Sequence, residues 1–115
     1  MKVGVVGCGY WGSKHVRMLH AMPEVSEVVA VDPFEERLHS LKQAFPGLAM
    51  YPHLESALDH VDAVIIATPP STHAALALTA LASGKSVLVE KPLATSTRDA
   101  RQLIDAGPRR SLNSS

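Results

Sequence analysis

The chain has 115 residues, of which 46% are hydrophobic and 19% are charged, and this size and composition are typical of one folded domain. Its 11 basic and 11 acidic residues give a formal net charge of zero, which argues against a nucleic-acid partner. The single cysteine excludes an internal disulfide, and the six histidines lack zinc-ligand spacing, so we expect no metal site. No apolar run approaches the roughly 18 residues of a membrane span, so we expect no membrane partner and a cytoplasmic location.

Short apolar runs alternate with helix-like stretches along the whole chain. Runs that stop at glycine, aspartate or proline predict strands, and stretches with one apolar face or a high alanine content predict helices. The expected order is strand 3–6, helix 11–22, strand 27–31, helix 33–45, strand 49–51, helix 54–58, strand 63–67, helix 72–83, strand 86–89 and helix 97–106. We expect Ser71 to cap the start of the fourth helix and Gly84 to follow its end.

The order of these elements predicts the fold class. Strands that are apolar on both faces and separated by helices form a parallel sheet covered on both sides, an α/β doubly wound fold. We expect about five strands in the Rossmann order 3-2-1-4-5, within a domain of residues 1–107, followed by a polar tail of residues 108–115. Right-handed crossovers then bring the loops at the carboxyl ends of the strands to one edge.

A glycine-rich turn follows the first predicted strand. Gly7, Gly9 and Gly12 fit the pattern G-x-G-x-x-G, in which the first glycine allows a tight turn and the second lets a pyrophosphate approach the backbone. The third lets the following helix pack closely on the strand, and the phosphates then lie at the helix N-terminus. The alternative is that these glycines only shape a turn and bind no dinucleotide. Asp32, 20 residues after Gly12 and at the end of the second strand, favours dinucleotide binding.

For several residues in or near this turn, the sequence allows two roles. Asp32 can accept hydrogen bonds from the adenosine ribose, which favours NAD over NADP because a carboxylate repels a 2′-phosphate. It can also cap the helix that starts at Pro33. Tyr10 and Trp11 can flank the cofactor, although Trp11 fits core packing equally well. For Cys8 we favour a small buried filler over a reactive thiol.

Three segments together resemble the Gfo/Idh/MocA family of glucose-fructose oxidoreductase, inositol dehydrogenase and rhizopine-catabolism proteins. These are the glycine-rich turn with the residues up to His15, the Thr68-Pro69-Pro70-Ser71-Thr72-His73 loop, and Glu90-Lys91-Pro92. The resemblance covers about residues 1–106. It implies an NAD(P)-dependent oxidoreductase that acts on a secondary hydroxyl of a sugar, sugar nucleotide or cyclitol.

The resemblance also implies residue roles. Gly7, Gly9 and Gly12 would cradle the pyrophosphate, and Asp32 would hold the adenosine ribose. Thr68, Pro69 and His73 would form the loop over the middle and nicotinamide side of the cofactor. Glu90 and Lys91 would lie beside the nicotinamide ring, and Lys91 would assist proton transfer from the substrate hydroxyl. A lysine can do this when burial or a nearby charge lowers its pKa, and a surface pair with Glu90 is the alternative for Lys91.

The family pattern stops near Ala106, where the family continues into another strand and a larger substrate domain. We therefore expect a chain that is truncated or frame-changed, that lacks the substrate domain, and that is weakly active or inactive alone. A non-enzymatic dinucleotide-binding or partner-binding module is the second hypothesis. An S-adenosylmethionine methyltransferase is the third, because such enzymes also use a glycine-rich turn and an acid after the second strand, although the Thr68 and Lys91 loops do not suit that ligand.

Overall fold

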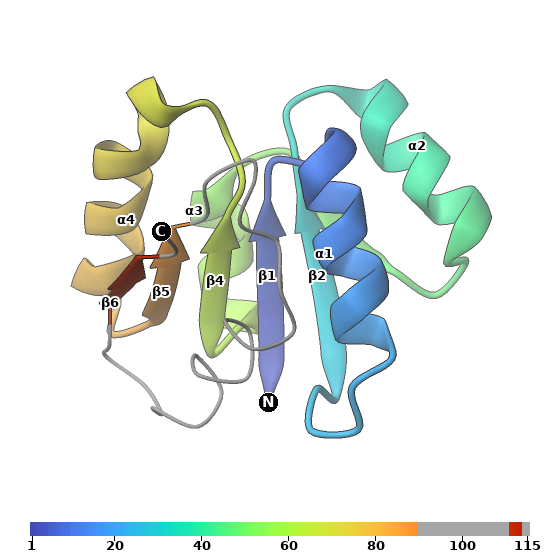
Figure 1. The fold of residues 1–115 in the computed structure, drawn as a ribbon, viewed down its shortest axis with the longest axis horizontal. Coiled ribbons are helices and arrows are strands. Elements are labelled where there is room, and N and C mark those ends of the chain that lie inside the picture. Colours follow the sequence, from blue (N-terminus) through green and yellow to red (C-terminus); the bar gives the residue numbers. More distant parts are fainter. Residues whose placement is uncertain (90–110, 114–115) are drawn as a thin grey trace.

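One parallel sheet forms the centre of the molecule, in the order β3-β2-β1-β4-β5-β6 (Figure 1). The computed structural model describes residues 1–89 and 111–113. The strands are β1 (Lys2–Val6), β2 (Glu27–Val31), β3 (Ala49–Tyr51), β4 (Ala63–Ile66), β5 (Ser86–Val89) and β6 (Ser111–Asn113). Every adjacent pair is parallel, so the carboxyl ends of the strands meet at one edge.

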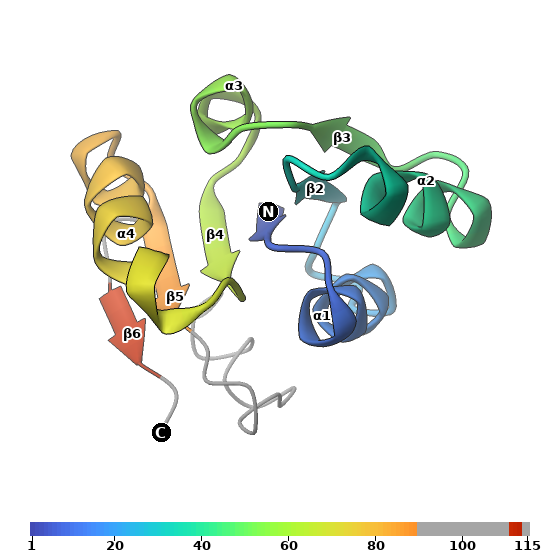
Figure 2. The same ribbon diagram turned by 90° about the horizontal axis from the view of Figure 1, so that it is seen from above.

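Helices cover both faces of the sheet. They are α1 (Tyr10–His20), α2 (Glu35–Ala44), α3 (Leu54–Ala57) and α4 (His73–Ala82), with 3-10 turns at Leu58–His60 and Pro70–Thr72. Figure 2 shows α1 and α3 on opposite sides of the sheet. Within residues 1–89 and 111–113, no helix combines the length and the apolar character that crossing a bilayer requires.

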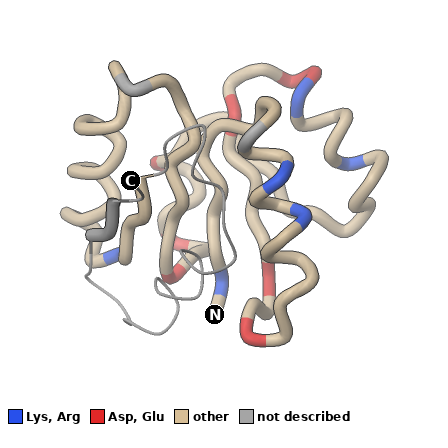
Figure 3. The backbone as a smooth tube through the Cα atoms, viewed as in Figure 1, with Lys and Arg blue, Asp and Glu red and all other residues tan. Residues whose placement is uncertain are grey.

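The alternation of side chains along each strand divides the buried residues into two layers. Val3 and Val5 of β1 pack with Val16 and Leu19 of α1 on one face. On the other face, residues such as Val64 of β4 pack against α3 and α4. Strands buried on both faces explain why these runs are continuously apolar. Figure 3 shows basic and acidic residues at several separate places around the described part of the chain, in keeping with its zero net charge.

The sheet confirms the predicted fold class and the order 3-2-1-4-5, and it adds a sixth strand. That strand, Ser111–Asn113, falls inside the predicted polar tail. Its only apolar residue is Leu112, so it has no periodicity that a sequence pattern could detect, and it is defined by its parallel pairing with β5. The predicted domain boundary stays a prediction, and the predicted helix 97–106 lies outside the described residues.

The ends of α4 confirm one prediction and correct another. Gly84 follows the helix with a left-handed φ of 77°, as expected of a helix C-terminal glycine. The predicted cap at Ser71 is wrong, because Thr72 is the N-cap residue and its side chain makes no capping hydrogen bond. The 3-10 turn Pro70–Thr72 moves the start of α4 one residue further along the chain than the prediction.

Candidate functional site

The glycine-rich turn joins β1 to α1 in a very tight path. Gly7 has a φ of 92°, a conformation that disfavours other residues, and its N–H donates a 2.8 Å hydrogen bond to the carbonyl of Val31. A Cβ on Gly12 would lie only 1.6 Å from the carbonyl oxygen of Gly7. Gly7 and Gly12 are therefore required by the protein's own packing, which confirms the close helix–strand approach that the motif predicts.

Gly9 differs from these two glycines. A Cβ built on Gly9 would meet nothing closer than the Arg37 guanidinium, at 3.7 Å, which is ordinary contact with a mobile side-chain end. Packing within the protein therefore does not explain this glycine. Gly9 is the N-cap residue of α1, at the helix N-terminus, where the helix dipole favours negative charge. A bare backbone at that place suits a bound anionic group that must approach closely.

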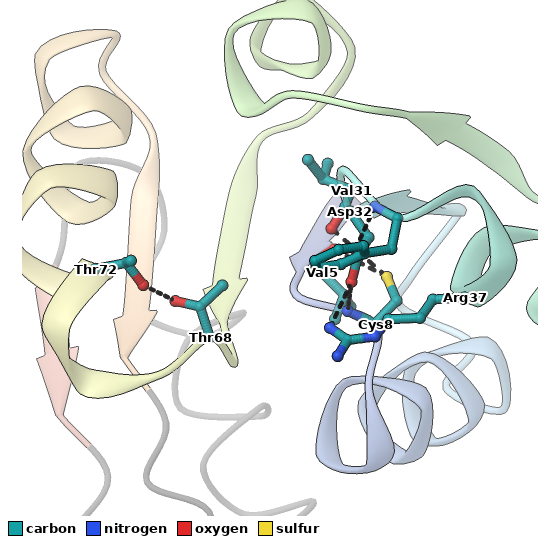
Figure 4. A network of polar contacts seen from close by, with 8 residues as sticks. Val5, Cys8, Val31, Asp32, Arg37, Thr68 and Thr72 are labelled. Carbon is teal, nitrogen blue, oxygen red and sulfur yellow. Dashed lines mark hydrogen bonds and ion pairs between the residues drawn. The ribbon is translucent and has the colours of Figure 1, made fainter.

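Asp32 follows β2 directly and lies beside the same turn (Figure 4). Its carboxylate is 1% exposed and accepts hydrogen bonds from the Cys8 N–H at 2.7 Å and the Phe34 N–H at 2.8 Å. The guanidinium of Arg37, half exposed, lies 3.3 Å from the carboxylate and stacks over the Phe34 ring at 4.9 Å. The N-cap of α2 is Phe34, so Asp32 shapes the turn into the helix without being its cap residue.

A crevice of about 770 Å³ lies between these two turns and the loop after β4. Its walls include Gly7, Gly9, Tyr10 and Asp32, and they also include Thr68 and Pro69. The structure therefore brings together six of the residues predicted from the sequence. The crevice lies at the carboxyl ends of the strands, where α/β folds bind their ligands. Phe34, Arg37, Pro52 and His53 also line it.

The crevice residues that follow β3 were not predicted from the sequence, although Pro52 and His53 come directly after the third predicted strand. Their position after a parallel strand was the available signal, because such residues collect at the binding edge. The position of Arg37 over Asp32 depends on the turn at Phe34, which no sequence pattern specified.

The loop after β4 is held by its own polar contacts. The hydroxyl oxygen of Thr72 lies 2.6 Å from the Thr68 hydroxyl and 2.8 Å from the Pro69 carbonyl. The Nε2–H of His73 donates to the Thr68 carbonyl at 2.6 Å. His73 therefore braces the loop, and it is not among the described residues that line the crevice. Its predicted cofactor contact stays a prediction.

The roles of three other predicted site residues, Trp11, Glu90 and Lys91, stay predictions. The side chain of Trp11 lies outside the described part of the structure, as do Glu90 and Lys91. The carboxyl end of β5 is at Val89, one residue before Glu90, and β5 pairs in parallel with β4. The strand before these residues therefore ends at the same edge of the sheet as the crevice.

Cys8 is buried inside the glycine-rich turn, 4% exposed, with its sulfur 3.6 Å from the Val31 carbonyl oxygen. Burial raises the pKa of the Cys8 thiol to about 12, and the negative charge of Asp32 acts in the same direction. The thiol therefore stays protonated at neutral pH. This environment agrees with a buried filler and not with a reactive nucleophile.

We predict that the native Cys8 thiol reacts with a disulfide reagent at pH 8 at least about 100-fold more slowly than in the urea-unfolded chain, because burial suppresses both access and the thiolate form. Because the pKa of the Cys8 thiol is raised, the reaction rate of the native chain should still be rising with pH beyond pH 9. Cys8 is the only cysteine, so the released chromophore reports one site. Equal native and unfolded rates would contradict the buried, protonated thiol.

The two kinds of glycine predict different outcomes for the same substitution. Gly12→Ala places a methyl group onto the Gly7 carbonyl, so we expect loss of the folded state or a stability loss of more than about 3 kcal/mol. Gly9→Ala meets no close atom, so its stability should stay within about 1 kcal/mol of the unchanged chain. Urea unfolding followed by circular dichroism measures both, and equal losses would refute this distinction.

Comparison with known proteins supports what the geometry indicates. Residues 1–113 match the model of the oxidoreductase family with an NAD-binding Rossmann fold, Gfo/Idh/MocA. Inositol 2-dehydrogenase 2 of Saccharopolyspora erythraea is 34% identical over 109 residues, which are 92% of this chain and 32% of that protein. The chain therefore spans about a third of the length of this relative.

Two solved structures are similar. GenD2 from gentamicin A biosynthesis, in complex with NAD, has a TM-score of 0.73 and 42% identity, over 90% of this chain and 30% of GenD2. The WlbA dehydrogenase of Bordetella pertussis, in complex with NADH and UDP-GlcNAcA, has a TM-score of 0.71 and 28% identity, over 92% and 32% of the two chains. With the family match over nearly the whole chain, these findings show that the chain belongs to the Gfo/Idh/MocA oxidoreductase family through its NAD-binding Rossmann domain.

Proposed function

We propose that this chain binds NAD in the crevice and is the cofactor-binding part of an oxidoreductase that oxidises a secondary hydroxyl of a sugar, sugar nucleotide or cyclitol. One observation carries the proposal. The bare backbone of Gly9, at the N-terminus of α1, and the buried carboxylate of Asp32 line the same crevice. A dinucleotide needs both features, an anion-binding turn for its pyrophosphate and an acceptor for its ribose hydroxyls.

The residues present fit this cofactor. Gly7 and Gly9 would hold the pyrophosphate, and Asp32 would accept hydrogen bonds from the adenosine ribose. Thr68 and Pro69, on the wall beyond the glycine-rich turn, would border the nicotinamide side. A buried carboxylate at the ribose favours NAD over NADP, because a 2′-phosphate there would be repelled. When bound, NAD supplies the hydride acceptor for the reaction.

The proton of the substrate hydroxyl needs an acceptor, and we assign that role to Lys91 with Glu90 beside it. The support is the family membership together with the position of β5, whose carboxyl end lies at the same edge of the sheet as the crevice. Tyr10, which is 69% exposed on the crevice wall, would flank the cofactor, with Trp11 next to it in the chain. His73 would hold the Thr68 loop in place through its hydrogen bond to the Thr68 carbonyl.

The substrate class follows from the relatives, one an inositol dehydrogenase and another solved with UDP-GlcNAcA. Both are about three times as long as this chain, since it covers 32% of each. Orienting a substrate and excluding water require groups beyond one cofactor-binding face. We therefore propose that a second domain or chain completes the substrate site, and that the 115-residue chain alone has little turnover.

Thermal unfolding with different ligands tests the proposal. A ligand that binds only the native state stabilises it by about 2.7 kcal/mol at 100 times its Kd, so NAD should raise the Tm clearly. NADP should raise it less, and S-adenosylmethionine should leave it unchanged. Gly9→Ala should reduce the NAD effect, because its methyl group enters the crevice. Gly47→Ala is the matched control, since Gly47 has no atom within 4 Å of a built Cβ and lies away from the crevice.

Two results would contradict the proposal. One is an unchanged Tm with millimolar NAD, and the other is a larger shift with S-adenosylmethionine than with NAD. Tight NAD binding without turnover, even after the chain is combined with proteins that co-purify with it, would instead favour a non-enzymatic dinucleotide-binding module.

A further inference from the structure

We infer that Asp32 is a positioning residue for the glycine-rich turn as well as the acceptor for the ribose. Its carboxylate fixes the Cys8 N–H, so the phosphate-binding turn is held in shape before any dinucleotide arrives. The inference rests on the proposed function for the roles of the turn and the carboxylate. It adds that these two parts of the site are energetically coupled through one side chain.

The first step is the hydrogen bond from the Cys8 N–H to Oδ2 of Asp32. Its length is 2.7 Å, it is buried, and it joins residues that are 24 positions apart in the chain. Cys8 is the residue between Gly7 and Gly9, so this bond acts on the middle of the proposed phosphate cradle. A buried N–H donating to a charged carboxylate is among the stronger hydrogen bonds in proteins.

The second step is the other oxygen of the same carboxylate. Oδ1 of Asp32 accepts the Phe34 N–H at 2.8 Å, in the turn that leads into α2. The two oxygens therefore hold main-chain donors from two different turns, one after β1 and one after β2. Figure 4 shows Asp32 beside Cys8, the donor in the first of these turns. Because both turns line the crevice, the carboxylate sets the position of one wall relative to the other.

The third step is the charge of the carboxylate. Asp32 is 1% exposed, so an uncompensated negative charge there would be costly. The two N–H donors and the Arg37 guanidinium, 3.3 Å away, supply the compensation. Arg37 is half exposed and its contact is the longest of the three, so the main-chain donors define the geometry.

The fourth step compares Cys8 with its neighbour Gly7. The Gly7 N–H is held at 2.8 Å by the backbone carbonyl of Val31, an acceptor that any residue at position 31 would provide. The Cys8 N–H is held by a side chain, so it depends on the identity of residue 32. A change at Asp32 therefore alters the turn itself, and not only the contact with the ribose.

The experiment uses the cofactor-free, ¹⁵N-labelled chain of 115 residues and the variant Asp32→Asn. The amide nitrogen of asparagine cannot accept, so one of the two N–H donors loses its partner. We expect the Tm to fall by at least about 5 °C and the Cys8 amide proton to move upfield. Asp62→Asn is the matched control, since the exposed Asp62 accepts a 2.8 Å hydrogen bond from the Lys2 N–H outside the crevice walls. It should change the Tm by less than half as much.

A second readout separates positioning from ribose contact. Nicotinamide mononucleotide has a phosphate but no adenosine ribose, so it reports on the turn without the predicted Asp32 contact. Removing a negative charge near the turn would by itself strengthen the binding of this anion. We expect Asp32→Asn to weaken it at least threefold instead, because the turn has lost its fixed shape. If the variant does not fold, a through-hydrogen-bond coupling between the Cys8 nitrogen and the Asp32 carboxyl carbon in the unchanged chain tests the bond directly.

Different failures have different meanings. An Asp32→Asn chain with an unchanged Tm, an unchanged Cys8 amide and weaker NAD binding would overturn the inference and leave the proposed function standing. Equal or tighter binding of nicotinamide mononucleotide by the variant would also overturn it. An unchanged chain that binds neither NAD nor the mononucleotide would overturn the proposed function and the coupling within it.

Discussion

The site depends on one backbone contact, where the start of α1 rests on the carbonyl of Gly7. A side chain on Gly12 would bring a Cβ to 1.6 Å from that oxygen, so only glycine permits the helix to begin there. This approach places the N-terminus of α1 at the carboxyl end of β1. The N-terminus of the helix then faces the crevice, and the positive end of the helix dipole lies where a phosphate would bind.

The neighbouring strand adds the opposite charge. Asp32 at the end of β2 lies within hydrogen-bond distance of the glycine-rich turn, so an acceptor for hydroxyls and a cradle for phosphates stand side by side. Thr68 completes the arrangement, because a Cβ on Gly7 would come within 2.9 Å of its methyl group. The ends of β2 and β4 therefore both pack against the glycine-rich turn after β1, and these three segments form much of the crevice wall.

Much of this could be predicted because it follows from local chemistry. The apolar runs predicted five strands and their order, and the spacing of Gly7, Gly9 and Gly12 predicted the tight turn. The failures concern elements that have no sequence pattern of their own. β6 is defined by its pairing with β5, and the start of α4 shifted because of a 3-10 turn. The hydrogen bond from the Cys8 N–H to Asp32 could not be predicted, because it joins two loops that are 24 positions apart in the chain. The bond from His73 to the Thr68 carbonyl lies within one loop and depends on the 3-10 turn before α4.

The most direct test of the account is a titration of the ¹⁵N-labelled chain with NAD, followed by amide chemical shifts. We predict that the largest changes fall on Gly7, Gly9 and Tyr10, on Asp32 and Phe34, and on Thr68, since these residues line the crevice. Changes centred instead on the pocket around His20 and Phe45, or no changes at millimolar NAD, would contradict the claim that this crevice binds the dinucleotide.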